Sequence, residues 1–333
     1  MREPAGDPLD PRHLGPEAVR RYLRAHGLAA RKELSQNHLA DGEVLAAIVA
    51  AADLAPGRLV LEVGPGLGIL TGALLEAGAA VIAVELDKEL ADLLLHRFAG
   101  RGLVAPAGRG TGTSPPGAGE PGAGTSPPGG AEPDTATTPP GPGELRLIEG
   151  DVLATPIREF LAPPYDVVAN IPYHITSPIL HHVLGEEPRP DRFVLMLQRE
   201  VAERIAAAPG QMSYVSVFTQ YHADVAVARI VPRGAFEPAP KVDSAILAGT
   251  VRSRRLSPDA EANLWRVVQA GFRERRKMLH NVLARQLPDI GHARVAQALA
   301  RAGIAPERRP QTLSVEEWLA LSAELAAPAG AVA

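Results

Sequence analysis

Short apolar runs alternate with amphipathic stretches between residues 59 and 251. Five of the runs predict β-strands, at 59–63, 81–85, 145–148, 166–169 and 193–197. The amphipathic stretches between them predict helices at 69–77, 88–98, 177–184 and 199–208. Such alternation predicts an α/β fold with right-handed crossovers, in which helices cover both faces of a mostly parallel sheet. Two more runs, 225–230 and 242–251, lie closer together, and we expect them to complete a seven-stranded sheet as an antiparallel pair.

Only helical periodicity follows residue 257. Helices are predicted at 258–271, 275–286, 292–302 and 314–325, and two more, at 16–26 and 41–52, precede the first strand. Ser314 and Glu317 have the spacing of a capping box, which marks a helix start. The sequence therefore predicts an α/β domain over residues 1–255 and a small all-helical domain over residues 256–333.

One segment inside the α/β domain has a different composition. Residues 104–143 contain 11 Gly and 10 Pro, with Ser, Thr and Ala making up most of the remainder. A segment like this cannot bury enough apolar surface to offset the entropy lost on ordering. We expect a disordered insert between the second and third strands of the sheet.

Composition excludes several classes of site. The chain has 46% hydrophobic residues, 22% charged residues and no cysteine, so disulfides, thiolate metal ligands and a thiol nucleophile are excluded. Residues 1–12 are polar, and no stretch approaches the roughly 20 apolar residues of a membrane span. We therefore expect a cytoplasmic protein that does not bind a membrane, and we assign no metal site.

A glycine-rich turn follows the first strand. Gly64 and Gly66 lie between that strand and the next helix, where glycine lets the backbone approach a ligand. Glu85 ends the second strand 21 residues after Gly64, a spacing that suits hydrogen bonds to ribose hydroxyls. Asp151 follows the third strand and could accept a hydrogen bond from an adenine amine. These features fit NAD as well as S-adenosylmethionine.

The tetrapeptide Asn170-Ile-Pro-Tyr173 after the fourth strand favours a methyl donor. The lone pair of an aromatic amine is delocalised, so the amine is a poor nucleophile. The Asn170 side-chain oxygen and the carbonyl of Ile171 or Pro172 can each accept one N–H and direct the lone pair at a methyl sulfonium. Pro172 fixes the turn, and Tyr173 offers a face for an unstacked base. Hydride transfer has no use for this tetrapeptide.

With these motifs in place, the sequence resembles the ribosomal RNA adenine N6,N6-dimethyltransferase family, in particular its bacterial small-subunit branch. The matching stretches are 34–39, 62–71, 84–87, 150–153, 170–178, 236–244, 272–277 and 313–317. They span most of the chain outside the first dozen residues and the insert. The resemblance implies a Rossmann-like methyltransferase domain that uses S-adenosylmethionine.

The resemblance also implies roles for individual residues. Those at the cofactor are Gln36, Asn37, Leu39, Gly64, Gly66, Glu85, Asp151 and Asn170. Within this set, the two glycines would cradle the methionine end, Glu85 the ribose and Asp151 the adenine. Those at the target base are Asn170, Pro172, Tyr173 and Phe236, with Phe236 helping to hold the base.

Three residues depart from the family pattern. Ser35 stands where the family usually has Gly, and His38 where it often has Phe. Met278 follows Lys277 where a small polar residue is common. The first two departures concern the segment that would cover the cofactor, not the reaction.

A basic region in the C-terminal part indicates RNA. Residues 251–285 carry nine Lys or Arg against three acids, a net charge of +6 in a chain of net charge −4. Such a run can hold phosphates without reading bases. The residues we assign to RNA binding are Lys241, Arg273, Arg275, Arg276 and Lys277. By the resemblance, the substrate is two adjacent adenines near the 3′ end of 16S rRNA in an immature small subunit, and we expect a monomer.

Three alternatives stay open at the level of sequence. The macrolide-resistance methyltransferases use the same chemistry on large-subunit rRNA, although the stretches 236–244 and 313–317 favour the small-subunit branch. A non-catalytic assembly factor could bind pre-ribosomes without turnover. A dehydrogenase would bind NAD at the same glycine turn.

Overall fold

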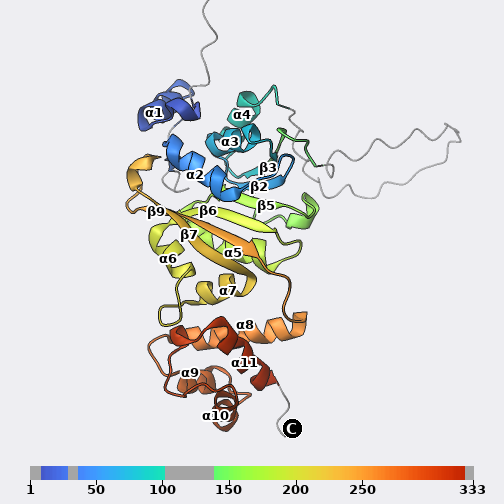
Figure 1. Cartoon of the computed structure of the whole chain (residues 1–333), viewed down its shortest axis with the longest axis vertical. Coiled ribbons are helices and arrows are strands. Elements are labelled where there is room, and N and C mark those ends of the chain that lie inside the picture. Colours follow the sequence, from blue (N-terminus) through green and yellow to red (C-terminus); the bar gives the residue numbers. More distant parts are fainter. Residues whose placement is uncertain (1–8, 29–36, 102–138, 327–333) are drawn as a thin grey trace, which may run out of the picture.

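The computed structural model describes residues 9–28, 37–101 and 139–326 (Figure 1). Gln36 and residues 104–138 of the predicted insert lie outside the described residues, so the predictions for them remain untested. The predicted insert was too long at its end, because residues 139–143 are ordered: Pro140 is buried and Gly143 N donates to the Ala79 carbonyl at 2.9 Å. Among the described residues, no helix is long and apolar enough to cross a bilayer.

The centre of the fold is a seven-stranded sheet. In spatial order its strands are β4 (Leu145–Glu149), β3 (Ala80–Glu85), β2 (Leu59–Val63), β5 (Asp166–Asn170), β6 (Arg192–Gln198), β9 (Ser244–Val251) and β7 (Ala223–Val231). The first five are parallel to one another, and β9 is antiparallel to both of its neighbours. The predicted Rossmann-like sheet with an antiparallel pair at one edge is therefore confirmed.

Helices cover both faces of this sheet (Figure 1). On one side lie α1 (Pro16–Ala25), α2 (Gly42–Ala52), α3 (Ile69–Glu76) and α4 (Lys88–Arg97), and on the other α5 (Thr176–Gly185), α6 (Arg199–Ile205) and α7 (Tyr214–His222). Val81 and Ala83 of β3 pack into the first hydrophobic cluster, whereas Ile82 and Val84 pack into the second. Because successive strand residues point to opposite faces, a strand buried on both sides is a continuous apolar run.

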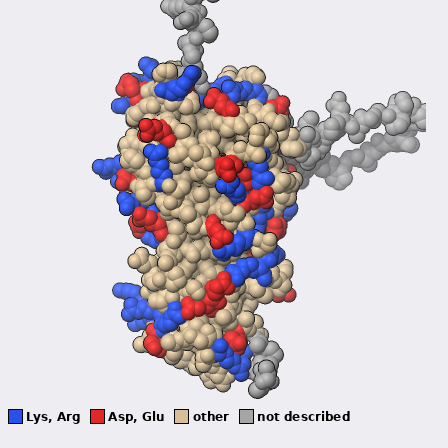
Figure 2. Space-filling model, in the orientation of Figure 1, with Lys and Arg blue, Asp and Glu red and all other residues tan. Residues whose placement is uncertain are grey.

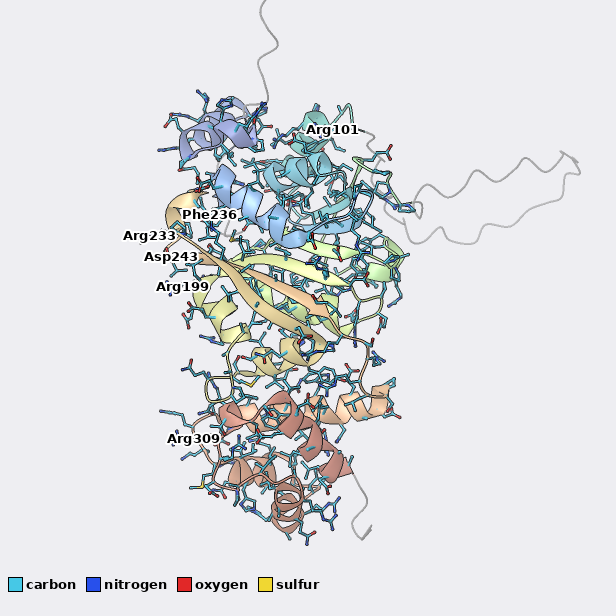
Figure 3. All side chains as sticks on the ribbon, viewed as in Figure 1. Arg101, Arg199, Arg233, Phe236, Asp243 and Arg309 are labelled. Carbon is cyan, nitrogen blue, oxygen red and sulfur yellow. The ribbon has the colours of Figure 1, made fainter. Side chains whose placement is uncertain are left out.

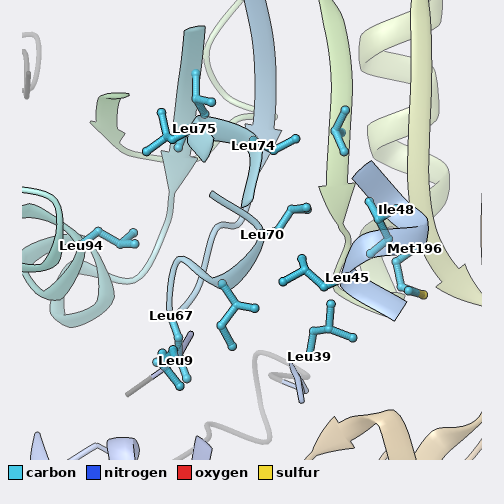
Figure 4. Close-up of a cluster of buried hydrophobic side chains, with 14 of the residues drawn as sticks. Leu9, Leu39, Leu45, Ile48, Leu67, Leu70, Leu74, Leu75, Leu94 and Met196 are labelled. Carbon is cyan, nitrogen blue, oxygen red and sulfur yellow. The ribbon is translucent and has the colours of Figure 1, made fainter. Parts of the chain in front are cut away.

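The first cluster joins helices, strands and the N-terminal segment. Figure 4 shows Leu45 and Ile48 of α2, Leu70 of α3 and Met196 of β6 within it. Leu39, from the segment before α2, belongs to the same cluster and is 3% exposed. This packing fixes the chain that crosses the carboxyl edge of the sheet.

The helix α7 was not predicted. Its sequence contains Val, Phe and Tyr at close intervals, which favour strands when read locally. A capping box between Ser213 and Ser216 begins the helix, and both of its sides are buried. Phe218 packs toward the sheet, while Val217 packs against the C-terminal helices. Tertiary burial thus decides the conformation of this segment.

A second, two-stranded sheet was also missed. It pairs β1 (His38–Leu39) with β8 (Phe236–Glu237) in an antiparallel arrangement, in the register Leu39 to Phe236. Two-residue strands are too short to leave a periodic pattern in the sequence. This pairing holds the segment before α2 against the segment before β9.

Up to residue 326, where the described part of the chain ends, the C-terminal part contains four α-helices, namely α8 (Pro258–Phe272), α9 (Leu279–Gln286), α10 (His292–Arg301) and α11 (Val315–Ala326). They pack around Trp318, which is fully buried. The predicted capping box is confirmed, because Glu317 N donates to Ser314 Oγ at 3.2 Å and Ser314 N donates to Glu317 Oε2 at 2.8 Å.

The predicted helix over 275–286 was wrong at its start. Residues 273–277 form a turn, and α9 begins at Leu279. Leu279 is fully buried in the C-terminal cluster, whereas residues 273–277 are all charged and offer no apolar side chain to that cluster. The basic residues therefore lie in a turn rather than on a helix.

Candidate active site

A cavity of about 310 Å³ lies where β2, β3, β4 and β5 end. Ligands of open α/β sheets bind outside the carboxyl ends of the strands, and this volume is in the range of small-molecule sites. Nine predicted site residues line it: Asn37, Leu39, Gly64, Gly66, Glu85, Asp151, Asn170, Pro172 and Tyr173. The fold therefore brings together residues that are up to 136 positions apart in the sequence.

The turn after β2 depends on its glycines. Gly64, Gly66 and Gly68 have φ values of 65°, 59° and 74°, in the left-handed region that favours glycine. A Cβ on Gly68 would lie 2.6 Å from Leu94 Cδ2 and 2.7 Å from the Phe98 ring. The turn therefore needs glycine both for its backbone and for the close approach of α4.

Glu85 holds this turn from the end of β3. Its Oε2 accepts the N–H of Gly66 at 3.0 Å, and its Oε1 accepts the N–H of Asp87 at 2.9 Å. The side chain is 6% exposed, and burial raises the pKa of its carboxyl. Two backbone bonds fix the carboxylate, whose remaining lone pairs can accept the hydroxyls of a ligand.

Glu62 is a cavity residue to which sequence reasoning gave no role. It lies in β2, is 1% exposed and accepts the hydroxyl of Thr71 at 2.7 Å. Burial raises the pKa of Glu62 to about 8, and the nearby Glu85 contributes to the same rise. The available signal was a single acid inside an otherwise apolar strand, directly before the glycine turn.

Asp151 lines the cavity at the end of β4. It follows β4 in an exposed turn, where its Oδ1 accepts the N–H of Leu153 at 2.9 Å. This bond orients the carboxylate and leaves the other oxygen as an acceptor for a ligand.

Asn170 is the last residue of β5, which places its amide at the carboxyl edge of the sheet. Its Nδ2 donates to the backbone carbonyl of Asn37 at 3.3 Å. In the turn that follows, the Pro172 carbonyl accepts the N–H of Ile175 at 3.1 Å. The side-chain oxygen of Asn170 is consequently the part of this amide that can accept an N–H from a substrate.

Tyr173 is held by a residue whose role was not foreseen. Its hydroxyl and Ser244 Oγ are 2.7 Å apart, and burial raises the pKa of the Tyr173 phenol. Ser244 is the first residue of β9 and is fully buried. The antiparallel edge of the sheet thereby orients the ring at the cavity.

Phe236 does not reach the cavity. It is 2% exposed and lies in the first hydrophobic cluster together with Leu39, its partner across the small β1–β8 sheet. The pairing of β8 with β1 turns the Phe236 ring into the hydrophobic core. In this structure the ring therefore does not line the cavity in which it was expected to help hold the base.

None of the predicted RNA-binding residues lines the cavity. Arg273, Arg275, Arg276 and Lys277 border a separate open hollow with Phe272 and Gln311. Lys241 borders another hollow with Arg199 and Arg233, and three acids, Glu200, Glu203 and Asp243, line the same hollow. The His, Asp and Glu side chains of the described residues form no cluster of three that could hold a metal ion.

Comparison with known families matches most of the chain. The model of the ribosomal RNA adenine dimethylase family matches residues 27–104 and 135–327, on either side of most of the glycine- and proline-rich segment. A protein of Dehalococcoides mccartyi named ribosomal RNA small subunit methyltransferase A is 36% identical over 92% of this chain and 92% of its own length. A protein of Geobacter sulfurreducens with the same name is 36% identical over 93% of this chain and its full length.

Solved structures agree with the fold. The 23S rRNA methyltransferase ErmE has a TM-score of 0.60 and 26% identity, and the match covers 87% of this chain and 99% of that one. A dimethyladenosine transferase from Plasmodium falciparum has a TM-score of 0.61 and 23% identity, covering 85% and 95%, and supports the fold alone. From these matches we conclude that the chain belongs to the ribosomal RNA adenine dimethylase family and is an S-adenosylmethionine-dependent methyltransferase of adenine in ribosomal RNA.

Proposed function

We propose that the protein methylates N6 of two adjacent adenosines near the 3′ end of 16S rRNA, within an immature small ribosomal subunit. The product is N6,N6-dimethyladenosine, and the enzyme acts as a monomer in the cytoplasm, where its substrate is assembled. The convergence of Asn170 and Tyr173 on an acid-lined cavity carries this proposal. Support for the small subunit comes from the names of the relatives at 36% identity, against 26% for the large-subunit enzyme ErmE.

The cavity fits S-adenosylmethionine better than NAD. Glu62, Glu85 and Asp151 line it, and among the described residues no Lys or Arg does. Glu62 holds a proton at neutral pH, since its pKa is raised to about 8, which leaves Glu85 and Asp151 as the lining carboxylates. Two carboxylates without a cation would repel the pyrophosphate of a dinucleotide but suit a cationic sulfonium. When bound, S-adenosylmethionine supplies an electrophilic methyl group on that sulfur. Gly64, Gly66 and the segment of Asn37 and Leu39 would hold its amino-acid end, Glu85 its ribose and Asp151 its adenine.

On the target side, Asn170 and Ile171 would orient the amine. Asn37 already engages the Asn170 Nδ2, so the Asn170 Oδ1 would accept one N–H of the adenine amine. The Pro172 carbonyl already accepts a backbone N–H, so the Ile171 carbonyl would accept the other. Two such acceptors in a fixed turn favour a pyramidal nitrogen whose lone pair points at the methyl group. The nitrogen then loses its extra proton to solvent.

The basic residues would hold the RNA around the target. Figure 3 shows Arg199, Arg233 and Arg309 along the same side of the molecule as Phe236 and Asp243. Figure 2 shows Lys and Arg side chains protruding along this edge, while acidic and basic residues mix over the face in view. The turn of residues 273–277 would add phosphate contacts that position the RNA without reading its sequence.

The central test is methyl transfer to undermethylated small and large ribosomal subunits in parallel, with identification of the modified nucleoside. We expect N6,N6-dimethyladenosine in the small subunit alone. Asn170→Ala should lower the rate by about 100- to 1,000-fold, the usual effect of removing one oriented polar group from an active site. Binding of the subunit should change little, because the basic turn stays intact.

Asn263→Ala is the matched control, because its amide bonds to the Ser322 carbonyl at 2.9 Å in the C-terminal helices. Label in the large subunit would instead favour the same chemistry on 23S rRNA, and normal turnover by the Asn170 variant would contradict the assigned mechanism. Subunit binding without label in either subunit would favour an assembly factor.

A second prediction concerns the basic turn. Replacing Arg275 and Arg276 by Ala should weaken binding to small subunits and lower the slope of log affinity against log salt by about 1 for each phosphate that the protein no longer neutralises. Filter binding at several salt concentrations measures both quantities. Arg266→Ala is the control, since this arginine is paired with Asp289 at 2.8 Å. An unchanged salt slope in the double variant would remove this turn from the RNA surface.

A third prediction concerns the proton on Glu62. Its pKa of about 8 in the folded protein lies above the ordinary value of 4.5, so the folded state binds this proton more tightly than the unfolded state. The stabilisation that the bound proton of Glu62 gives to the folded state is therefore lost as pH rises from 4.5 to 8. The free energy of unfolding falls by at most about 1.4 kcal/mol per pH unit from this cause. Glu62→Gln keeps an acceptor for Thr71 and stays neutral, so it should become progressively more stable than the wild type between pH 5 and 8. The free energy of unfolding of both proteins is measured with urea at several pH values. If the difference between the two proteins does not change with pH, the pKa of Glu62 is not raised by folding.

A further inference from the structure

One buried polar side chain at the cavity has no role in the mechanism above. His38 lines the cavity and is 7% exposed. Its backbone lies in β1, where pairing with Glu237 of β8 fixes its position. The imidazole at this position has two ring nitrogens that can form hydrogen bonds.

The two ring nitrogens of His38 have different surroundings. Nε2 is enclosed by protein and has no hydrogen-bond partner. Nδ1 faces the glycine turn and lies 3.5 Å from the point that a Cβ on Gly66 would occupy. Burial lowers the pKa of His38 to about 4, so the ring is neutral at neutral pH, with one N–H donor and one lone pair.

The enclosure of Nε2 decides which nitrogen carries the proton. An enclosed N–H without an acceptor is rarer in folded proteins than an enclosed acceptor without a donor. The favoured tautomer therefore has its lone pair on the enclosed Nε2 and its proton on Nδ1. This tautomer presents an N–H donor beside Gly66, at the turn that receives the amino-acid end of the methyl donor under the proposed function.

The charge of the cavity indicates which group of the ligand the His38 Nδ1–H would bind. Three acids line the cavity and, among the described residues, no Lys or Arg does. The α-carboxylate of S-adenosylmethionine is an anion and must therefore be met there by neutral N–H groups. We propose that His38 is a hydrogen-bond donor of the methyl-donor site, with Nδ1–H binding this α-carboxylate. The inference rests on the proposed function, because it assumes that S-adenosylmethionine occupies this cavity.

The test compares two ligands that differ in one group. Isothermal titration, without RNA, measures the Kd of S-adenosylmethionine and of its decarboxylated analogue. His38→Phe keeps an aromatic ring of similar size but removes the donor, so we expect the Kd of S-adenosylmethionine to rise about tenfold or more. The Kd of the decarboxylated analogue should stay within about twofold of the wild-type value. His38→Asn, whose amide nitrogen can replace Nδ1–H, should recover part of the lost affinity.

His182→Phe is the matched control, because His182 is also 7% exposed and has a buried Nε2 without a partner but does not line the cavity. Equal weakening of both ligands by His38→Phe would show that the imidazole only packs in the site, and unchanged binding of both would show that it does not engage the ligand; either result overturns the inference. A wild-type protein that binds neither ligand would instead contradict the proposed cofactor site. Urea unfolding of each variant separates loss of binding from loss of folding. If His38→Phe does not fold, the Kd values of His38→Asn for the two ligands test the inference instead.

Discussion

The parallel pairing of β3, β2 and β5 is the constraint on which the chemistry of this protein depends. It brings the ends of three strands to one edge, so that Glu85, the glycine turn and Asn170 meet around one cavity. The antiparallel strand β9 extends the same sheet and contributes Ser244, which orients Tyr173. The reactive groups are therefore held by strand ends rather than by long loops, which keeps their geometry fixed before a substrate binds.

Hydrogen bonds between side chains and backbone across this edge couple the two halves of the site. Glu85 binds the N–H of Gly66 and so joins β3 to the turn after β2. Asn170 binds the carbonyl of Asn37 and so joins the target side to the segment that passes over the cavity. That segment is in turn paired with β8 through β1. Glu85 and Asn170 are thus each fixed by a neighbour, Gly66 or Asn37, that also lines the cavity. The acidic side chains in the lining give the cavity its negative character.

Elements with a strong periodic pattern could be predicted from the sequence, and those that depend on tertiary contacts could not. The sheet, its antiparallel edge and seven of the cavity residues follow from apolar runs and from motifs at strand ends. Two more cavity residues, Asn37 and Leu39, follow only from the family resemblance. The helix α7 reads locally as a strand and is decided by burial on both sides, at Phe218 and at Val217. The two-residue strands β1 and β8 leave no pattern, so the burial of Phe236 could not be foreseen. The start of α9 was placed too early because charged residues 273–277 are compatible with a helix but give it nothing to pack against.

The proposed chemistry depends on Asn170 and Ile171 as the two acceptors of the target amine, and one structure tests that assignment directly. The measurement is a crystal structure of the protein with S-adenosylhomocysteine and adenosine. We predict adenine N6 within hydrogen-bonding distance of both Asn170 Oδ1 and the Ile171 carbonyl, with the Tyr173 ring against the base. A base whose N6 contacts neither acceptor, or a homocysteine end bound away from the glycine turn, would contradict the assignment.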